Sequence, residues 1–511
     1  MSLLSPKTAP FNTVFMQNKI NQYLQNDSYF RNIILGLFCL FIIIRLFNLT
    51  APIVDRHSWN QISTAAQAMN IYKNPISFFQ PDSNAIQSKN DSSVMAQEFP
   101  IYMGILAVGY QLFGTDIIVA RIISIIIASI GWIYLLKLCR ISESRLSTLA
   151  ILFIYTMNAH NWFFDRAIQS DTGMVACMLA ALYYFYQYLE YRKVHQILKL
   201  ILFTTLAGLF KPFGLAIGIG FLYLIWRKKE YDLLKDPLIW LMGIIAWGAL
   251  LSWLFYTKLY LSNSIGLGHK LGFDLDALFS FQYYNILQSR FFDWILTPFL
   301  AIFFLIGLFS KKTKTDIGSA LLVSNIFYLI YITHGNMEHN YYQLPLTPAL
   351  SIYTGLGLVC FFEGKSPKLT SKTRKIIVTC VLIGFVLYSG KNAWSHFKLS
   401  PGPKIIGDYF KTLQLPAHSK ILAVEAYKTQ YHEILYYADL KGYVVRDLDA
   451  NAIKLYKSRG VVYIGIHLER NADKSKRILK TLSQYTNEIW SSKNCTDNYG
   501  KPCLMGIYQI N

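Results

Sequence analysis

Four carboxylates that lie far apart in the sequence each stand at the edge of a strongly apolar segment: Asp55, Glu98, Asp165 and Asp171. A carboxylate at such an edge can stay hydrated while it touches the membrane surface. If these edges meet at one rim of the membrane, the side chains could provide a general base and ligands for a divalent cation. Asp55, Asp171 and Glu98 are therefore the catalytic candidates, and Asp55 and Asp171 are the two that could bind a metal. A helix cap or a loop ion pair is the ordinary alternative for each.

Cationic and aromatic side chains accompany these carboxylates. Lys211 precedes Pro212 between two short apolar segments, where it could hold a phosphate as a point charge or extend its stem towards water. His339, Tyr341 and Tyr342 directly precede another apolar segment. We expect them to contact a sugar or a phosphate, although tyrosines are also common in interfacial aromatic belts. The candidate substrate-binding residues are Arg56, Arg166, Lys211, His339, Tyr341 and Tyr342.

The composition is that of a membrane protein. Only 15% of the 511 residues are charged and 53% are hydrophobic, whereas soluble proteins carry about 25% charged residues. The net charge of +20 comes from lysines and arginines in short gaps between apolar runs, which is typical of cytoplasmic loops. No basic helix or recognition motif is present, so a nucleic acid is not an expected partner.

The apolar runs predict a polytopic α-helical fold with about eleven transmembrane helices. Residues 100–113 form a shorter apolar segment, which we interpret as a helix lying in the membrane interface. The predicted spans are residues 32–49, 117–138, 146–164, 172–190, 197–210, 212–226, 237–257, 291–309, 317–333, 345–362 and 375–391.

The interfacial interpretation of residues 100–113 decides the orientation of the chain. With it, five clusters holding eighteen lysines and arginines fall on the same side as the basic N-terminus, as expected for cytoplasmic loops. Residues 1–31 are then a cytoplasmic segment and 32–391 a transmembrane catalytic domain. The external face collects the first loop, residues 50–116, together with residues 165–171, Lys211, residues 258–290 and residues 333–345. Function is therefore expected outside.

Two details of the spans concern the candidate site. Arg45 lies near the outer end of the first span, and we favour a side chain that snorkels outward over one that faces the protein. Residues 165–171 divide an apolar stretch, residues 147–190, that is too long for a single crossing of about 20 residues. A turn there needs only Gly, Asn or Ser, so two aspartates and an arginine are more than a turn requires.

Residues 392–511 are predicted to form a small extracytoplasmic α/β domain. Strands are expected at residues 421–424, 443–445 and 461–466, and helices near 429–438, 450–458 and 474–486. Cys495 and Cys503 have a spacing that allows a local disulfide, which would fit an oxidising compartment. Cys39, Cys139, Cys177, Cys360 and Cys380 lie in or beside apolar runs and are expected to act as small hydrophobic residues.

Taken in order, these motifs resemble the GT-C membrane glycosyltransferases, in particular the branch of protein O-mannosyltransferases and lipid A aminoarabinose transferases. The motifs are Asp55 after the first span, Glu98-Phe-Pro100, Arg166-Ala-Ile-Gln-Ser-Asp171, Lys211-Pro212 and His339-Asn-Tyr-Tyr-Gln-Leu-Pro345. The resemblance covers about residues 30–390. It implies inverting transfer of a sugar from a polyprenyl-phosphate donor to a hydroxyl or phosphate of a lipid, glycan or protein acceptor, on the extracytoplasmic side.

The resemblance also implies roles for single residues. Asp55 would be the general base, Asp171 the carboxylate of the second loop and Glu98 the acidic residue before a proline in the first loop. Lys211 would cradle the lipid phosphate, with Arg166 and His339 as helpers. Two departures stand out: Arg56 follows Asp55 where many relatives carry a second acid, and Lys211 is followed by Pro-Phe-Gly rather than Gly-Pro. The metal requirement and the aminoarabinose substrate are therefore not carried over.

A transporter or flippase for a lipid-linked sugar or a small solute is the main alternative. Such a protein would place charges at the midplane of discontinuous helices and show repeats between its halves. Here the charges gather at one rim and no repeat is present. The expected location of the enzyme is the bacterial inner membrane, as a multi-pass protein of the cell envelope with a cytoplasmic N-terminus.

Overall fold

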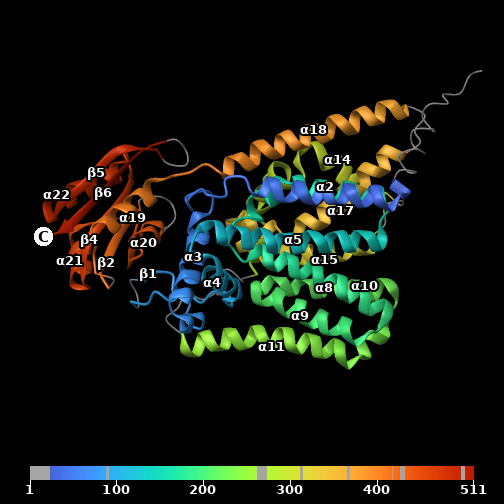
Figure 1. Cartoon of the computed structure of the whole chain (residues 1–511), viewed down its shortest axis with the longest axis horizontal. Helices are drawn as coiled ribbons and strands as arrows, with labels where there is room; N and C mark the ends of the chain where they lie inside the picture. Colours follow the sequence, from blue (N-terminus) through green and yellow to red (C-terminus); the bar gives the residue numbers. More distant parts are fainter. Residues whose placement is uncertain are drawn as a thin grey trace, which may run out of the picture.

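A computed structural model gives the fold, and it describes residues 24–87, 91–261, 273–310, 313, 315–364, 369–416, 418–425, 432–496 and 501–511. A long helical bundle carries a smaller α/β domain at one end (Figure 1). The predicted combination of a polytopic helical protein with a C-terminal α/β part is confirmed. The basic residues Lys311, Lys312, Lys314, Lys365 and Lys368, most of the N-terminal segment and part of the predicted loop 258–290 lie outside the described residues.

The bundle contains a helix at every predicted span. By length and composition, five of the described helices could cross a membrane, or six if the bent pair Phe281–Ile295 and Thr297–Phe309 counts as one span. The number of crossings therefore stays a prediction. The helices are α2 (Asp27–Arg45), α5 (Ile117–Ser142), α6 (Arg145–Met157), α7 (Ala159–Phe164), α8 (Asp171–Tyr191), α9 (Val194–Phe210), α10 (Ile217–Lys228), α11 (Pro237–Tyr260), α13 (Phe281–Arg290), α14 (Thr297–Phe309), α15 (Asp316–Tyr331), α17 (Leu346–Glu363) and α18 (Ser371–His396).

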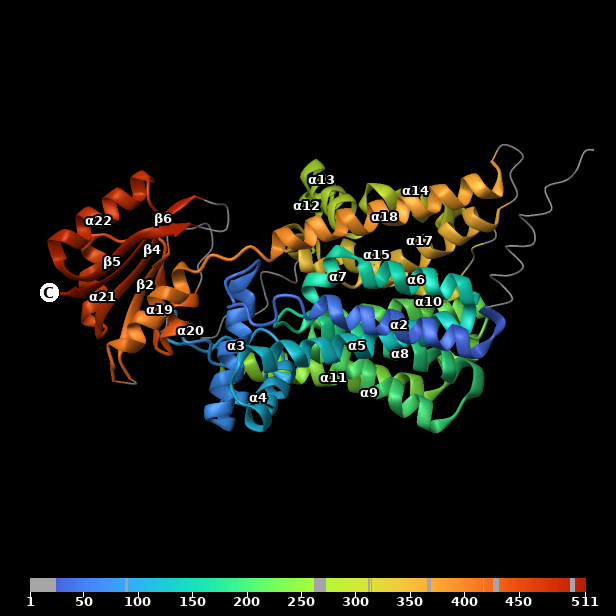
Figure 2. The same cartoon turned by 45° about the horizontal axis from the view of Figure 1, so that its top comes forward.

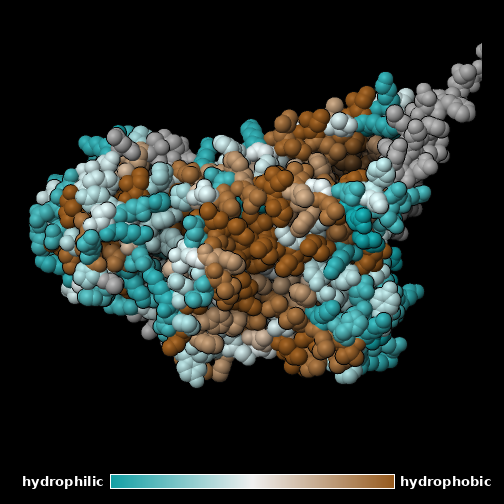
Figure 3. Space-filling model, viewed as in Figure 1, coloured by the Kyte–Doolittle hydropathy of each residue, from teal (hydrophilic) through white to brown (hydrophobic). Residues whose placement is uncertain are grey.

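The surface of the bundle is that of a membrane-embedded domain. On the face shown in Figure 3, apolar side chains cover the middle of the bundle, between polar surface on the α/β domain and polar surface at the opposite end. An apolar band of this kind suits a surface that contacts lipid tails, where exposed polar groups are costly. The α/β domain and the opposite end of the bundle therefore lie outside the apolar layer.

The first loop, residues 50–116, folds at the end of the bundle next to the α/β domain. It contains α3 (Ser58–Lys73) and α4 (Ile101–Phe113), which lie between the bundle and that domain in both views (Figures 1 and 2). One side of α4 packs on the core through residues such as Leu106 and Tyr110, while Val108 and Leu112 are exposed. An apolar exposed side suits a helix in the membrane interface, and this assignment stays a prediction.

Local sequence explains where the helices that frame the candidate site begin and end. The Asn158 side chain accepts a hydrogen bond from the His160 N–H and donates to the Ile295 carbonyl at 2.7 Å, so one amide caps α7 and ties it to the bent pair. Pro212 interrupts the helical run after Lys211, and a 3-10 turn, η2 (Pro212–Ala216), separates α9 from α10. Polar side chains at both breaks are thereby held at helix ends.

The C-terminal domain is a six-stranded sheet with the strand order β1-β3-β2-β4-β6-β5. Strands β1, β3, β2 and β4 run parallel, whereas β6 pairs antiparallel with β4 and β5. Helices pack beside the sheet, as Figure 1 shows. The elements are β1 (Ala85–Ile86), α19 (Gly402–Thr412), β2 (Lys420–Glu425), α20 (Glu433–Ala438), β3 (Lys441–Val445), α21 (Ala450–Ser458), β4 (Val461–Glu469), α22 (Asp473–Tyr485), β5 (Thr486–Thr496) and β6 (Pro502–Ile510).

The three predicted strands and the helices at 450–458 and 474–486 are confirmed. The predicted helix 429–438 is present from Glu433, and residues 429–431 lie outside the described part. Strands β5 and β6 and helix α19 were not predicted. Strand β1 comes from the first loop, so the sheet of the C-terminal domain is completed by a segment more than 300 residues earlier in the chain. Cys495 and Cys503 form the expected disulfide between β5 and β6.

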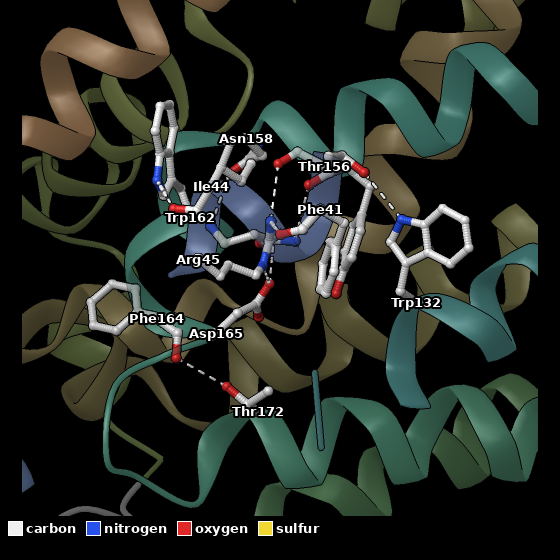
Figure 4. Close-up of polar contacts among 12 residues, drawn as sticks. Phe41, Ile44, Arg45, Trp132, Thr156, Asn158, Trp162, Phe164, Asp165 and Thr172 are labelled. Atoms are coloured by element: carbon white, nitrogen blue, oxygen red, sulfur yellow. Dashed lines mark hydrogen bonds and ion pairs between the residues drawn. The ribbon is translucent and has the colours of Figure 1, made fainter. Parts of the chain in front are cut away.

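An ion pair between Arg45 and Asp165 joins the first helix to the turn before α8 (Figure 4). Arg45 is fully buried and donates to Asp165 Oδ2 from Nε at 2.9 Å and from Nη2 at 2.6 Å. Its Nη1 donates to the Phe41 and Thr156 carbonyls, and its guanidinium lies 3.5 Å from the centre of the Phe41 ring. The expectation that Arg45 snorkels outward was wrong: the side chain faces the protein because a buried carboxylate is there to neutralise it.

We predict that Asp165→Asn destabilises the folded protein strongly, because the substitution leaves the Arg45 charge buried without a counter-charge. Breaking a buried pair in this way costs roughly 3–5 kcal/mol. Thermal unfolding in detergent measures the effect. The matched control is Asp316→Asn, which breaks the exposed pair with Arg227 and should cost about 1 kcal/mol or less. Equal shifts of the unfolding midpoint in the two variants would contradict the prediction.

Candidate active site

Two charged clusters lie at the end of the bundle next to the C-terminal domain. The first, called the Asp55 cluster, consists of Asp55, Gln61, Arg121 and Arg166. The second, called the Lys211 cluster, consists of Lys211, Asp171, Glu98 and Ser170. Arg166, Ser170 and Asp171 belong to the same short segment between α7 and α8, so this segment contributes to both clusters.

The Asp55 carboxylate is 1% exposed and is bound on both oxygens. Arg166 Nη2 donates to Oδ2 at 3.0 Å, and Arg121 Nη2 lies 3.8 Å from the same oxygen. Gln61 Nε2 donates to Oδ1 at 2.8 Å. The two guanidinium groups are themselves oriented by backbone carbonyls, since both donate to Asn48 and Arg121 also donates to Leu49. The carboxylate is therefore fixed in place by two guanidinium groups and one amide.

Lys211 is 3% exposed and lies between two carboxylates. Its Nζ is 3.0 Å from Asp171 Oδ2 and 3.2 Å from Glu98 Oε1. The other oxygen of Glu98 accepts a hydrogen bond from Ser170. Burial lowers the pKa of the Lys211 ammonium, but the nearby Asp171 and Glu98 carboxylates outweigh it and raise this pKa above its usual range. The lysine is therefore charged.

Hydrogen bonds from α3 join the two clusters. Gln61 accepts from the Ile168 N–H at 3.2 Å while its amide nitrogen holds Asp55. One residue earlier, Asn60 donates to the Gln169 side chain at 3.2 Å. The segment that carries Arg166, Ser170 and Asp171 is thus fastened to the helix that follows Asp55. The structure brings Asp55, Glu98, Asp171 and Lys211 to one end of the bundle, as the sequence suggested.

Aromatic rings from the segment before α17 cover Lys211. The Nζ atom lies 5.1 Å from the ring centres of both Tyr341 and Tyr342, within the range of a cation–π contact. The Tyr341 ring stacks on His339 at 5.1 Å and meets His57 edge-on at 5.1 Å. Tyr341 therefore lies between the lysine and the loop that carries Asp55.

Two candidate residues, Asp165 and Arg56, do not contact the other candidates in the way that the sequence suggested. Asp165 belongs to the same turn as Arg166, but its carboxylate is held by Arg45 and contributes to packing. The Arg56 side chain is exposed and is absent from the described hydrogen bonds of the Asp55 cluster, although its backbone N–H donates to the His396 carbonyl at 3.1 Å. Arg56 therefore remains available at the surface of the site.

Sequence reasoning missed Arg290, which organises the segment carrying His339. Its guanidinium donates to the carbonyls of Asn336, Met337 and His339 and to the Gln343 side chain. Nothing in the local sequence marks Arg290, since it is the last residue of an ordinary polar helix, α13, and meets its partners only through the fold.

A group of histidines beside Asp55 was also missed. The rings of His57, His160 and His396 lie around Phe164 at centre-to-centre distances of 4.7–6.0 Å. Burial lowers the pKa of His57 to about 3, with Arg56 adding to the shift, so this imidazole is neutral and its Nε2 bonds to Asn340 Oδ1 at 2.6 Å. The position of His57, two residues after Asp55, was the available signal.

The carboxylates of both clusters are neutralised by side chains rather than grouped as an open metal site. A divalent ion at Asp55 would have to displace Arg166, and one at Asp171 would have to displace Lys211. Among the described residues, the three side chains spaced closely enough to hold a metal are His467, Cys495 and Cys503 in the C-terminal sheet, and the two cysteines are already joined in a disulfide. The donor set at the charged clusters therefore does not fit a metal in this conformation, and no step is derived through one.

Comparisons with known proteins agree on the fold. Residues 98–256 match the family described as dolichyl-phosphate-mannose-protein mannosyltransferase. A comparison with curated proteins gave no match. The structure of ArnT from Cupriavidus metallidurans bound to undecaprenyl phosphate is similar with a TM-score of 0.60 and 10% sequence identity, over 93% of this chain and 97% of that chain.

Two further solved structures share the fold. The Archaeoglobus fulgidus oligosaccharyltransferase tethered with an acceptor peptide has a TM-score of 0.57 and 11% identity, over 94% of this chain and 74% of that chain. The arabinofuranosyltransferase AftD from Mycobacteria has a TM-score of 0.58 and 12% identity, over 94% of this chain and 40% of that chain. The family match over residues 98–256 and the fold shared with these solved glycosyltransferases agree with the resemblance to GT-C membrane glycosyltransferases that the sequence predicted.

Proposed function

We propose that the protein moves a sugar from a polyprenyl-phosphate donor onto a hydroxyl or phosphate of a lipid, glycan or protein acceptor, with inversion. The reaction takes place at the extracytoplasmic face of a bacterial inner membrane, and the N-terminus is cytoplasmic. The observation that carries the proposal is the meeting of the Asp55 and Lys211 clusters at one end of the bundle. The similarity to ArnT bound to undecaprenyl phosphate supports a lipid phosphate as the leaving group.

In the proposed reaction the Asp55 carboxylate accepts the proton of the acceptor group. The deprotonated oxygen attacks the anomeric carbon from the face opposite to the phosphate. The bond between this carbon and the phosphate oxygen breaks, and polyprenyl phosphate leaves with the electron pair. Arg166 and Arg121 hold the Asp55 carboxylate in place for this proton transfer.

Lys211 is the proposed partner of the donor phosphate, because cations lower the energy of the charge that develops on the leaving oxygen. Its charge is balanced by two carboxylates, so the phosphate has to replace one of them. Glu98 is the better candidate to give way, since its side chain is 18% exposed whereas that of Asp171 is 1% exposed. Tyr341, Tyr342 and His339 would then line the sugar side of the phosphate.

We predict that Asp55→Asn lowers the rate of sugar transfer at least about 100-fold, the usual contribution of a general base. Donor binding should persist. The assay follows a radiolabelled sugar from polyprenyl phosphate to the acceptor in membranes or nanodiscs. Because the amide leaves Arg166 and Arg121 without their counter-charge, Asp55→Glu is the second variant: it keeps the charge and displaces the base. Wild-type turnover in either folded variant would overturn the assignment of Asp55.

If Lys211 binds the lipid phosphate, removing Lys211 and removing the charge of Glu98 should have different effects on the binding of a polyprenyl phosphate. Lys211→Met should weaken binding of a short-chain polyprenyl phosphate about 10-fold or more, because the phosphate then meets two carboxylates without their cation. Glu98→Gln should bind it at least as tightly as the wild type, because it removes a competitor for the lysine. Lys228→Met, at the opposite end of α10, is the control and should bind normally. Weaker binding by Glu98→Gln would contradict the exchange of Glu98 for phosphate.

A further inference from the structure

The short segment around Asp55 makes several hydrogen bonds to the part of the chain after residue 392. The Ile53 N–H donates to the Tyr437 hydroxyl at 2.6 Å, and the Ser58 hydroxyl donates to Glu433 Oε1 at 2.8 Å. Between them, the Val54 carbonyl accepts from the Ser400 N–H at 3.0 Å. Together with the bond from the Arg56 N–H to the His396 carbonyl, four hydrogen bonds flank Asp55 on both sides.

Two of these four bonds come from side chains of one short helix, α20. Tyr437 and Glu433 are 8% and 3% exposed, so water does not compete for their contacts. Bonds to the backbone or side chains of a loop hold it well only when the holding groups are themselves fixed. Helix α20 meets this condition, since Ile434 and Leu435 are buried in the core of the C-terminal domain.

The segment needs such support because its backbone is strained. His57 has φ 55° and ψ 30°, a left-handed conformation that is unfavourable for residues other than glycine. His57 is also the residue before α3, and its side chain does not cap that helix. A strained backbone conformation is kept only where surrounding contacts hold it in place. Here α20 provides two of the contacts that hold the segment around His57.

We infer that α20 is a positioning element for Asp55, and that Tyr437 and Glu433 are positioning residues that hold the 53–58 segment in its reactive conformation. The inference rests on the proposed function, in which Asp55 is the base. It gives the C-terminal domain a task in the reaction: movement of this domain relative to the first loop changes the place of the carboxylate. A domain that binds an acceptor can then act on the base through these contacts.

Tyr437→Phe tests the inference with the removal of a single oxygen atom. The variant should lower kcat about 10-fold and leave the KM for the donor within twofold, because Lys211 and its partners are untouched. Hydrogen exchange in residues 50–60 should become faster. The control is Asp439→Asn, which breaks the exposed pair with Lys73 in the same interface and should change neither quantity. Wild-type kcat together with wild-type exchange in Tyr437→Phe would overturn the inference.

The two readouts separate this inference from the proposed function. If the wild type transfers no sugar from polyprenyl phosphate, the proposed function fails, and hydrogen exchange alone still decides whether α20 holds the segment. If the wild type is active and Tyr437→Phe shows faster exchange without a loss of kcat, the contact is structural and the positioning role is rejected. Tyr437→Trp, which offers no acceptor for the Ile53 N–H, should also lower kcat.

Glu433 adds a test by pH. Burial raises its pKa to about 7 from a usual 4.5, against an opposing hydrogen bond from Ser58. Buried Glu425 on β2 lies beside it, and His432 is the preceding residue. Because the pKa of Glu433 is higher in the folded state, its protonated form contributes to the stability of the fold. This contribution is full below about pH 4.5 and is lost as pH rises to about 7.

Glu433→Gln keeps an oxygen that accepts from Ser58 and removes the titration. Protection of residues 50–60 from hydrogen exchange, corrected for the intrinsic effect of pH, should fall in the wild type between pH 5 and 7. In Glu433→Gln it should change less over the same range. Identical profiles would show that the titration of Glu433 does not act on the segment, and Asp439→Asn should follow the wild type.

Discussion

Neutralising buried charge is the constraint on which the rest of this structure depends. Isolated ions in a low-dielectric interior cost several kcal/mol each, and a close partner of opposite charge offsets much of this cost. Asp165, Asp55 and Asp171 are each 1% exposed or less, and each has a cation from another part of the chain: Arg45, Arg166 and Lys211. These pairs fasten α2, the first loop, the turn before α8 and the break after α9 to one another.

The two clusters of the candidate site are neutralised unequally. Asp55 faces two guanidinium groups, whereas Lys211 faces two carboxylates. The two guanidinium groups fix the position of the Asp55 carboxylate, which suits a base that must meet its acceptor in a set geometry. A cation surrounded by excess negative charge is held firmly until another anion replaces one of its partners, which suits a site that binds a lipid phosphate and releases it. The imbalance, rather than the mere presence of charges, makes the two clusters chemically different.

The parts of the fold that follow from local pattern were predictable. Apolar runs located the helices of the bundle, and α21 was predicted at residues 450–458 with the observed bounds. Strand β5 was missed because its sequence, Thr-Asn-Glu-Ile-Trp-Ser-Ser-Lys-Asn-Cys-Thr, is mostly polar, as an edge strand can be. The prediction for Arg45 was wrong because an isolated charged side chain near the end of a span usually snorkels towards water. Its partner Asp165, 120 residues away in the sequence, allows the side chain to face the protein instead.

The candidate site shows the same division between local signals and tertiary contacts. Asp55, Asp171, Glu98 and Lys211 could be singled out because charged residues at the ends of apolar segments are costly, and their meeting needed only a common side of the membrane. Arg290 and Tyr437 carry no such signal, since an arginine at the end of a polar helix and a tyrosine in a small domain are ordinary. Tyr437 bonds to a backbone N–H 384 residues away. Residues that hold a reactive loop are therefore the hardest to predict, because their role is defined by a partner that only the fold supplies.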